Sequence, residues 1–196
     1  MLYYSPQIWC SDNTDAADWL EIHYGTSFFY PISPFGAHVS VCPNHQTGRT
    51  TPLRTRGTVA GSGTFGYELD LGHMDEEEKQ AATKQIEQFK AAEGLVQTGD
   101  YYRLSAPGDR SNSVFWEFVS KDKRDVLVSG VVLRSEVNPP VYFLRFRGLM
   151  PDRLYREKES GETYSGIVLM KAGLAVPVTS EDYEAVAYRF EVVEKG

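Results

Sequence analysis

The pattern of apolar residues changes near residue 98, and few folds accommodate both halves. Before this point, short strand-like runs alternate with segments that have helical spacing. After it, brief runs rich in Val, Phe, Tyr and Leu are separated by turn residues, without helical periods. We therefore predict two domains: an α/β segment over residues 1–98 and an antiparallel β-sandwich over residues 99–196.

The first half predicts strands that alternate with helices. Strands are expected at 5–10, 36–44 and 64–71, and helices at 16–25, 51–63 and 75–93. Four residues at i, i+3, i+4 and i+7 give the first helix a buried face: Ala16, Trp19, Leu20 and His23.

The last of these helices has the clearest signal. Asp75 and Glu78 have the spacing of a capping box, and acids crowd the first turn. Gly94 is the expected end. The predicted buried stripe consists of Ala82, Ile86 and Phe89.

Short apolar runs in the second half predict strands. Turn-forming stretches such as APGDRSNS, KDKRD and EVNPP separate them. The runs are SVFWEFVS, DVLVSGVVL, VYFLRFRGL, LYREKE, GIVLM and YRFEVVE.

Composition excludes several functions. The chain has 196 residues, a net charge of −7 and 41% hydrophobic residues, which suit a folded protein. A nucleic-acid partner is not expected, because a phosphate-binding surface needs clustered Lys and Arg and these are scattered among acids here. No apolar run approaches the roughly 20 residues of a membrane span, so no membrane is expected either.

The opening MLYYSPQIW lacks the features of a signal peptide and is typical of a domain interior. We expect the chain to begin within a domain and predict a cytoplasmic location.

Three metal-binding residue types lie close together at His38, Cys42 and His45. A structural zinc site needs four ligands, so Cys10 or His23 would have to supply the fourth. We favour the alternative that these are ordinary buried or lining side chains, and we expect no metal or organic cofactor. Cys10 and Cys42 could pair, but two cysteines carry no disulfide framework.

The segment GSGTFG at 61–66 matches the spacing of a dinucleotide-binding loop. That loop needs a helix at its end, whose N-terminus meets the pyrophosphate. Here YELDL follows and alternates like a strand. We therefore expect these glycines to permit close packing at the end of a helix rather than to bind a nucleotide.

The segment IWCSDNTD at 8–15 ends a strand-like run with two acids, Asp12 and Asp15. In (β/α)₈ barrels the working residues lie where strands end, on loops that lead into helices. A helix start needs one capping side chain, which Asp15 or Thr14 can supply. Asp12 then remains, beside Trp9, as a candidate catalytic carboxylate.

Several segments together resemble the C-terminal part of glycoside hydrolase family 36 α-galactosidases: MLYYSPQIWCSDNTDA, YGTSFFYPIS, HVSVCPNHQTGRTTPLRTRG, GTFGYELDL, TGDYYRLSAP and GETYSGIVLMKAGL. The resemblance extends along essentially the whole chain. It implies about strands 6 to 8 of a (β/α)₈ TIM barrel over residues 1–98, followed by the family's β-sandwich over residues 99–196. It also implies that Asp12 is the general acid/base and that Trp9 and Cys10 line the galactose pocket.

The same resemblance implies a nucleophile, an aspartate in a Lys-x-Asp setting on the fourth barrel strand. The one such triplet here, residues 123–125, lies in a predicted turn. A retaining glycosidase needs two carboxyl groups roughly 5–5.5 Å apart. We therefore expect part of a retaining α-galactosidase, inactive alone, whose full-length form is a homotetramer that hydrolyses melibiose- or raffinose-type oligosaccharides.

A non-catalytic carbohydrate-binding or interaction module is the alternative function. It is favoured because three barrel strands cannot close a barrel and leave unpaired edges. We also expect two aromatic patches in the core, with stacking on the sugar rings of a substrate as the second interpretation if the protein is a sugar enzyme: Tyr3 with Tyr4, and Phe28, Phe29 with Tyr30.

Overall fold

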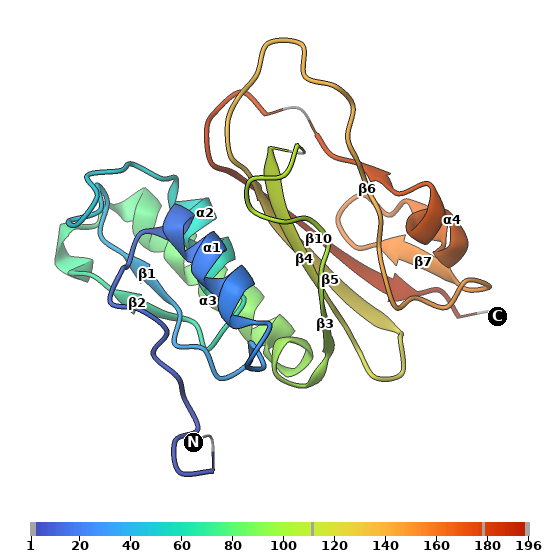
Figure 1. The fold of residues 1–196 in the computed structure, drawn as a ribbon, viewed down its shortest axis with the longest axis horizontal. Helices are drawn as coiled ribbons and strands as arrows, with labels where there is room; N and C mark the ends of the chain where they lie inside the picture. Colours follow the sequence, from blue (N-terminus) through green and yellow to red (C-terminus); the bar gives the residue numbers. More distant parts are fainter. Residues whose placement is uncertain (1–2, 111, 178, 195–196) are drawn as a thin grey trace.

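The computed structural model describes residues 3–110, 112–177 and 179–194, and its elements alternate as predicted in the first half. Strands β1 (His38–Ser40) and β2 (Gly66–Glu68) pair in parallel, and an isolated parallel bridge joins Ile8 to Phe35. The helices are α1 (Ala16–Thr26), α2 (Leu53–Ala60) and α3 (Glu76–Thr98), with a 3₁₀ turn at Leu71–His73. Figure 1 shows these helices beside the large sheet of the second half.

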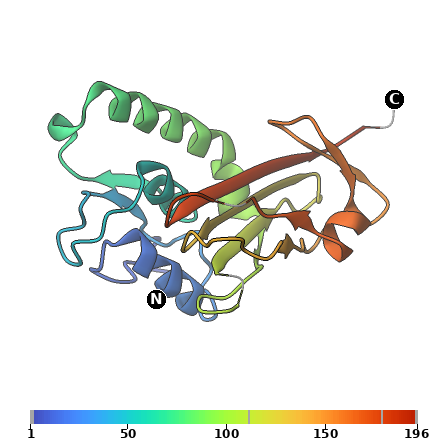
Figure 2. The ribbon, with the colours of Figure 1, turned by 90° about the horizontal axis from the view of Figure 1, so that it is seen from above.

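The second half is an antiparallel sheet with a smaller layer against it. Six strands follow the order β3-β4-β5-β10-β7-β8, and β6 pairs with β9 in a separate two-stranded sheet. Figure 2 shows α3 lying alongside the large sheet. The bounds are β3 (Asp100–Arg103), β4 (Ser113–Val119), β5 (Asp125–Val132), β6 (Phe143–Leu144), β7 (Leu154–Glu157), β8 (Thr163–Ser165), α4 (Gly166–Lys171), β9 (Leu174–Ala175) and β10 (Glu184–Val192).

Strand β4 is buried along its whole length, because both faces of the sheet are covered. Trp116 and Phe118 pack in one cluster with Trp19 of α1 and Val96 of α3. Phe115 and Val119, on the opposite face, pack in a second cluster with residues of β6, α4 and β10. A strand with two buried faces has no reason to alternate apolar with polar residues, which explains the run VFWEFV.

Two expectations about helices hold. The predicted face of α1 is buried at all four positions. Asp75 and Glu78 form the capping box at the start of α3, with Asp75 Oδ1 accepting from Glu78 N at 2.8 Å.

The end of α3 and part of its buried face were predicted wrongly. The helix passes Gly94, where a side chain would meet nothing within 4 Å, and ends before Gly99, where a Cβ would lie 2.5 Å from Leu95 O. Ala82 is buried as predicted, but Ile86 is 37% exposed. Because the last turns of α3 pack on the sheet, the other buried positions lie nearer its C-terminus, at Ala92 and Val96.

Two predicted strands also differ from the structure. The segment GIVLM forms α4, where Ser165 Oγ accepts from Val168 N and Leu169 is buried. Periodicity cannot separate strand from helix in so short an apolar run. The strand expected at 5–10 contracts to the single bridge at Ile8.

The glycines of GSGTFG permit close packing, as expected. A Cβ on Gly63 would lie 2.4 Å from Phe35 O, and one on Gly66 would lie 2.7 Å from the His38 ring. Strand β2 follows directly. Among the described residues, no helix is both long and apolar enough to cross a membrane.

A single carboxyl group interrupts the apolar face that β4 turns toward β6 and α4. Glu117 is fully buried, and its Oε1 accepts from the backbone N–H of Arg147 at 2.6 Å. Its Oε2 has no hydrogen-bond partner among the described residues. Burial raises the pKa of Glu117 to about 8, and the bond from Arg147 offsets only part of that effect.

Glu117 should make stability depend on pH. Its ordinary pKa is 4.5 and its folded pKa is about 8, so the folded state holds an extra proton between these values. The contribution of Glu117 to the free energy of unfolding should therefore fall as pH rises through this window, by up to about 1.4 kcal/mol per pH unit. The buried His23 contributes the opposite slope below its ordinary pKa of 6.5, so the Glu117 effect is read as the difference between the parent chain and Glu117→Gln. Glu117→Gln keeps the acceptor for Arg147 and should remove this slope. Urea unfolding from about pH 5 to pH 9 measures it, with Glu87→Gln on the exposed face of α3 as control. Equal slopes in the parent chain and in Glu117→Gln would contradict the assignment.

Candidate active site

Asp12 and Trp9 lie together at the start of the first helix–strand unit. Trp9 Nε1 donates a hydrogen bond of 2.9 Å to Asp12 Oδ1. The indole is 46% exposed and lies beside the His38 ring, with 5.0 Å between ring centroids. Among the described residues, the Asp12 carboxylate accepts one hydrogen bond, from Trp9, and because Asp12 is exposed it remains accessible.

Asp15 is the cap of α1. Its Oδ1 accepts from Ala17 N at 2.8 Å and from Asp18 N at 3.2 Å, and the residue is 1% exposed. The prediction that Asp15 or Thr14 caps the helix is confirmed for Asp15. Asp12 takes no part in the cap.

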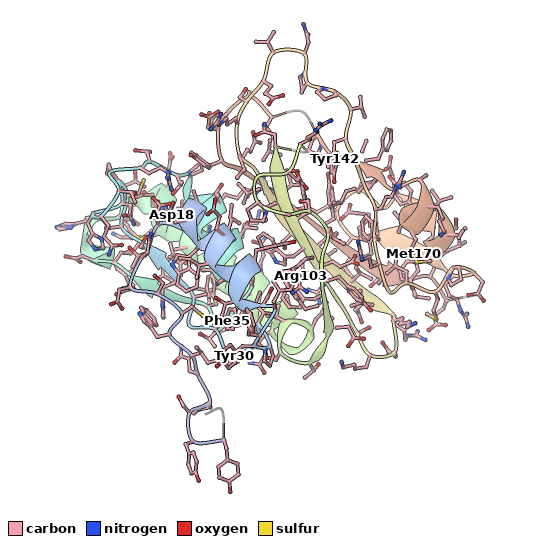
Figure 3. All side chains as sticks on the ribbon, in the orientation of Figure 1. Asp18, Tyr30, Phe35, Arg103, Tyr142 and Met170 are labelled. Atoms are coloured by element: carbon pink, nitrogen blue, oxygen red, sulfur yellow. The ribbon has the colours of Figure 1, made fainter. Side chains whose placement is uncertain are left out.

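Arg49 joins the loop after β1 to this helix start. Its Nη1 lies 2.5 Å from Asp15 Oδ1 and 2.8 Å from Asp18 Oδ1, and Figure 3 labels Asp18 near this end of α1. Partial burial acts to raise the pKa of Asp18, but hydrogen bonds from Arg49 and Asn13 outweigh it and lower that pKa. The hydrogen bond from Arg49 to Asp18 raises the pKa of Arg49 in turn.

The loop after β1 also holds the main chain of residues 12–14. Gln46 bonds the backbone of Asp12 and Thr14, and Asn44 Nδ2 donates to Thr14 Oγ1 at 3.0 Å. Ser40 Oγ donates to Thr14 O at 2.7 Å. Our sequence analysis did not identify Asn44 and Gln46 as site residues. The signal that could have identified them is the polar cluster NHQTGR at the end of a predicted strand.

Cys10 lies on the other side of the segment from Trp9. It packs with Ile8 against the core cluster that contains α1, and this burial raises the pKa of its thiol. The structure therefore brings Trp9 and Asp12 together, whereas it directs Cys10 toward the helix. Both cysteines are free.

The residues considered for zinc are dispersed. His23 is 5% exposed in the core, where its Nδ1 lies 2.8 Å from Ser62 Oγ, and burial lowers its pKa to about 3. His38 faces Trp9. The described part of the chain holds no group of three or more His, Cys, Asp or Glu placed to bind a metal ion.

The aromatic patches are exposed, contrary to prediction. Tyr3 is 90% exposed and Phe29 is 85% exposed. Phe28 lies under the guanidinium of Arg103, 3.9 Å from its ring centroid, and these residues line a groove of about 550 Å³. Figure 3 labels Tyr30 and Arg103 beyond the end of α1 opposite Asp18. This groove is therefore separate from the Asp12 site.

Comparison with known proteins assigns a class to this combination of fold and site. Residues 1–99 match the family model "Melibiase", and residues 113–190 match "Glycosyl hydrolase family 36 C-terminal domain". These two matches define a glycoside hydrolase. The chain belongs to glycoside hydrolase family 36, in agreement with the resemblance found in its sequence.

Relatives in this family are α-galactosidases. The bifunctional α-galactosidase/sucrose kinase AgaSK of Mediterraneibacter gnavus is 51% identical over 100% of this chain and 21% of its own length. The α-galactosidase AgaA of Geobacillus stearothermophilus is 47% identical over 100% of this chain and 26% of its own length. The chain thus spans about a fifth to a quarter of these relatives.

Solved structures of these relatives share the fold. The galactosidase domain of AgaSK matches 98% of this chain and 27% of its own, with 51% identity and a TM-score of 0.96. An AgaA variant in complex with raffinose matches 98% of this chain and 27% of its own, with 46% identity and a TM-score of 0.94.

The two acids should differ in their contribution to stability. Asp15→Ala removes a cap worth about 0.5–2 kcal/mol and leaves Arg49 without its buried partner, so it should lower the free energy of unfolding by about 2 kcal/mol or more. Asp12→Ala removes an exposed side chain and should change that free energy by less than about 0.5 kcal/mol. Urea unfolding of the two variants measures both values. A larger loss in Asp12→Ala would reverse the roles.

Proposed function

We propose that residues 1–196 supply the general acid/base of a retaining α-galactosidase, which removes terminal α-linked galactose from melibiose- or raffinose-type oligosaccharides. The observation that carries this proposal is the exposed carboxylate of Asp12, which accepts from Trp9 Nε1 at 2.9 Å and is not used in the cap. Relatives named α-galactosidases, one of them bound to raffinose in its solved structure, support the substrate class.

In this proposal Asp12 works in two steps. It donates its proton to the departing glycosidic oxygen and later accepts a proton from the water that hydrolyses the galactosyl-enzyme. The bond from Trp9 occupies Oδ1, which leaves Oδ2 to meet the substrate. Trp9 and Cys10 are proposed to line the galactose pocket. The exposed indole of Trp9 fits this role, whereas the Cys10 thiol packs toward α1, so Cys10 would line the pocket with its main chain.

The catalytic nucleophile is proposed to come from residues outside 1–196. Parallel pairing of β1 with β2, and of Ile8 with Phe35, supports the assignment of residues 1–98 to the last strands of a (β/α)₈ barrel. The antiparallel sheet with its β6-β9 layer supports a β-sandwich domain over 99–196. A homotetramer in the cytoplasm, working without a metal or organic cofactor, completes the proposal.

One observation favours a second function. The exposed Phe28 and Phe29 line a groove with Arg103, a combination suited to a carbohydrate-binding or interaction module without catalysis. The two experiments below separate this module from the enzyme.

The 196-residue chain alone should not hydrolyse a nitrophenyl α-galactoside. Hydrolysis with retention requires a second carboxylate opposite Asp12, which we propose lies elsewhere. Absorbance of released nitrophenol from rigorously purified chain measures this. Turnover that Asp12→Ala abolishes would show that the chain carries its own nucleophile.

A chimera tests the role of Asp12 directly. Residues 1–196 replace the matching segment of AgaA, and Asp12→Ala is introduced. Loss of acid assistance should slow raffinose hydrolysis by about 10²–10⁴-fold, because its leaving group needs a proton. A nitrophenyl galactoside leaves without one, so its glycosyl-enzyme should form and accumulate. Added azide, which needs no deprotonation, should then restore turnover and yield α-galactosyl azide.

Asp15→Ala is the matched control in the same chimera. Loss of a cap should damage both substrates alike and show no rescue by azide. Rescue in Asp15→Ala but not in Asp12→Ala would move the assignment by three residues. An inactive parent chimera that still binds galactose-containing sugar would favour the binding module.

A further inference from the structure

Gln46 bridges the backbone on either side of Asn13. Its Nε2 donates to Asp12 O at 3.0 Å, and its Oε1 accepts from Thr14 N at 3.0 Å. The side-chain amide of Gln46 thus satisfies one backbone C=O and one backbone N–H of this segment. A neighbouring β-strand would satisfy the same two groups with its own backbone. The contact joins positions separated by 34 residues in sequence.

Gln46 itself projects from a fixed turn. Asn44 is 5% exposed, and its Oδ1 accepts from Gln46 N at 2.9 Å and from Thr47 N at 3.1 Å. The other end of the Asn44 amide donates to Thr14 Oγ1. The turn and the segment it contacts are therefore held in one hydrogen-bonded network.

We propose that Gln46 is a positioning residue for Asp12: it fixes the main chain from which the carboxylate projects, while Trp9 orients the carboxylate itself. This inference rests on the proposed function, in which Asp12 exchanges protons with the substrate. Without the bridge, the peptide at Asp12 loses its bond to the loop after β1, and the carboxylate can shift relative to the indole. A displacement of about 1 Å in a catalytic group can cost roughly 10²-fold in rate.

Three variants separate positioning from general loss of structure. Gln46→Ala removes the bridge. Gln46→Glu fills the same space and keeps an acceptor for Thr14 N, but it places an oxygen where Nε2 donated to Asp12 O. Gln85→Ala is the matched control, because the Gln85 amide also bridges two elements, donating to Leu53 O at 2.9 Å and accepting from Tyr67 at 2.7 Å.

The first measurement is made on the 196-residue chain and needs no activity. The indole N–H resonance of Trp9, identified by its disappearance in Trp9→Phe, reports the hydrogen bond to Asp12. In both Gln46 variants this resonance should move upfield and its exchange with water should quicken severalfold, at fixed pH. The control should leave both unchanged. An unchanged Trp9 resonance in folded Gln46→Ala would overturn the inference, as would a parent-like signature in Gln46→Glu.

The second measurement uses the AgaA chimera. Gln46→Ala should lower kcat for raffinose by about tenfold to a hundredfold and leave KM within about twofold, because a misplaced proton donor affects the transition state more than binding. Gln85→Ala should preserve kcat at a temperature where it is folded. An unchanged kcat in Gln46→Ala would refute positioning. If the parent chimera is inactive, the proposed function fails, whereas the indole measurement still decides whether Gln46 holds Asp12.

Discussion

The burial of β4 on both faces is the constraint on which the arrangement of the molecule depends. Trp116 and Phe118 close the core beneath α1 and α3, and Phe115 closes the core beneath α4. Burying a large apolar side chain contributes roughly 1.5–3 kcal/mol, so a strand that buries one at nearly every position stabilises both layers at once. Helices α1 and α3 bury apolar side chains in the cluster that contains one face of this strand.

This constraint extends to the site. The face of α1 that packs on β4 fixes the helix, and the start of that helix carries Asp15, which binds Arg49. Arg49 also lies 5.6 Å above the ring of Tyr183, which immediately precedes β10, and Thr55 of α2 donates to Tyr183 O. The second half therefore supports the loop that holds Asp12. The segment for which we propose the acid/base role therefore gains rigidity from contacts with the second half of the chain.

Features of the fold that depend on residues close together in sequence could be predicted. The cap at Asp15, the capping box of α3 and the buried face of α1 each follow from spacings of three or four residues. The sequence also predicted close packing at Gly63, because a strand and not a helix was expected after GSGTFG. The alternation of strand and helix also followed from the pattern of apolar runs, whereas the parallel pairing of β1 with β2 was expected only from the resemblance to a (β/α)₈ barrel.

Contacts between distant segments were beyond the same reasoning. The bridge from Gln46 to Asp12 joins positions 34 apart, and nothing near Gln46 distinguishes it from a solvated loop residue. In the sequence, Glu117 is not distinguished from an ordinary polar residue of a strand. Its burial depends on the distant loop at Arg147, whose backbone N–H donates to its carboxyl group. The aromatic residues near Phe29 were placed in the core by composition alone, although the described chain supplies no layer to cover them.

The two acids of SDNTD show how position decides chemistry between identical side chains. Both oxygens of Asp15 accept from groups that hold the fold: Oδ1 from Ala17 N and from Arg49, and Oδ2 from Thr47 Oγ1 at 2.5 Å. Because both oxygens are engaged in these bonds, that carboxylate has no oxygen free to meet a substrate. Asp12 accepts one bond, from an indole that cannot neutralise it, and its exposed side chain is held through the backbone instead. Asp12 is thus fixed through its main chain while its Oδ2 accepts no hydrogen bond from the described residues and can meet a substrate, which supports the role proposed for Asp12.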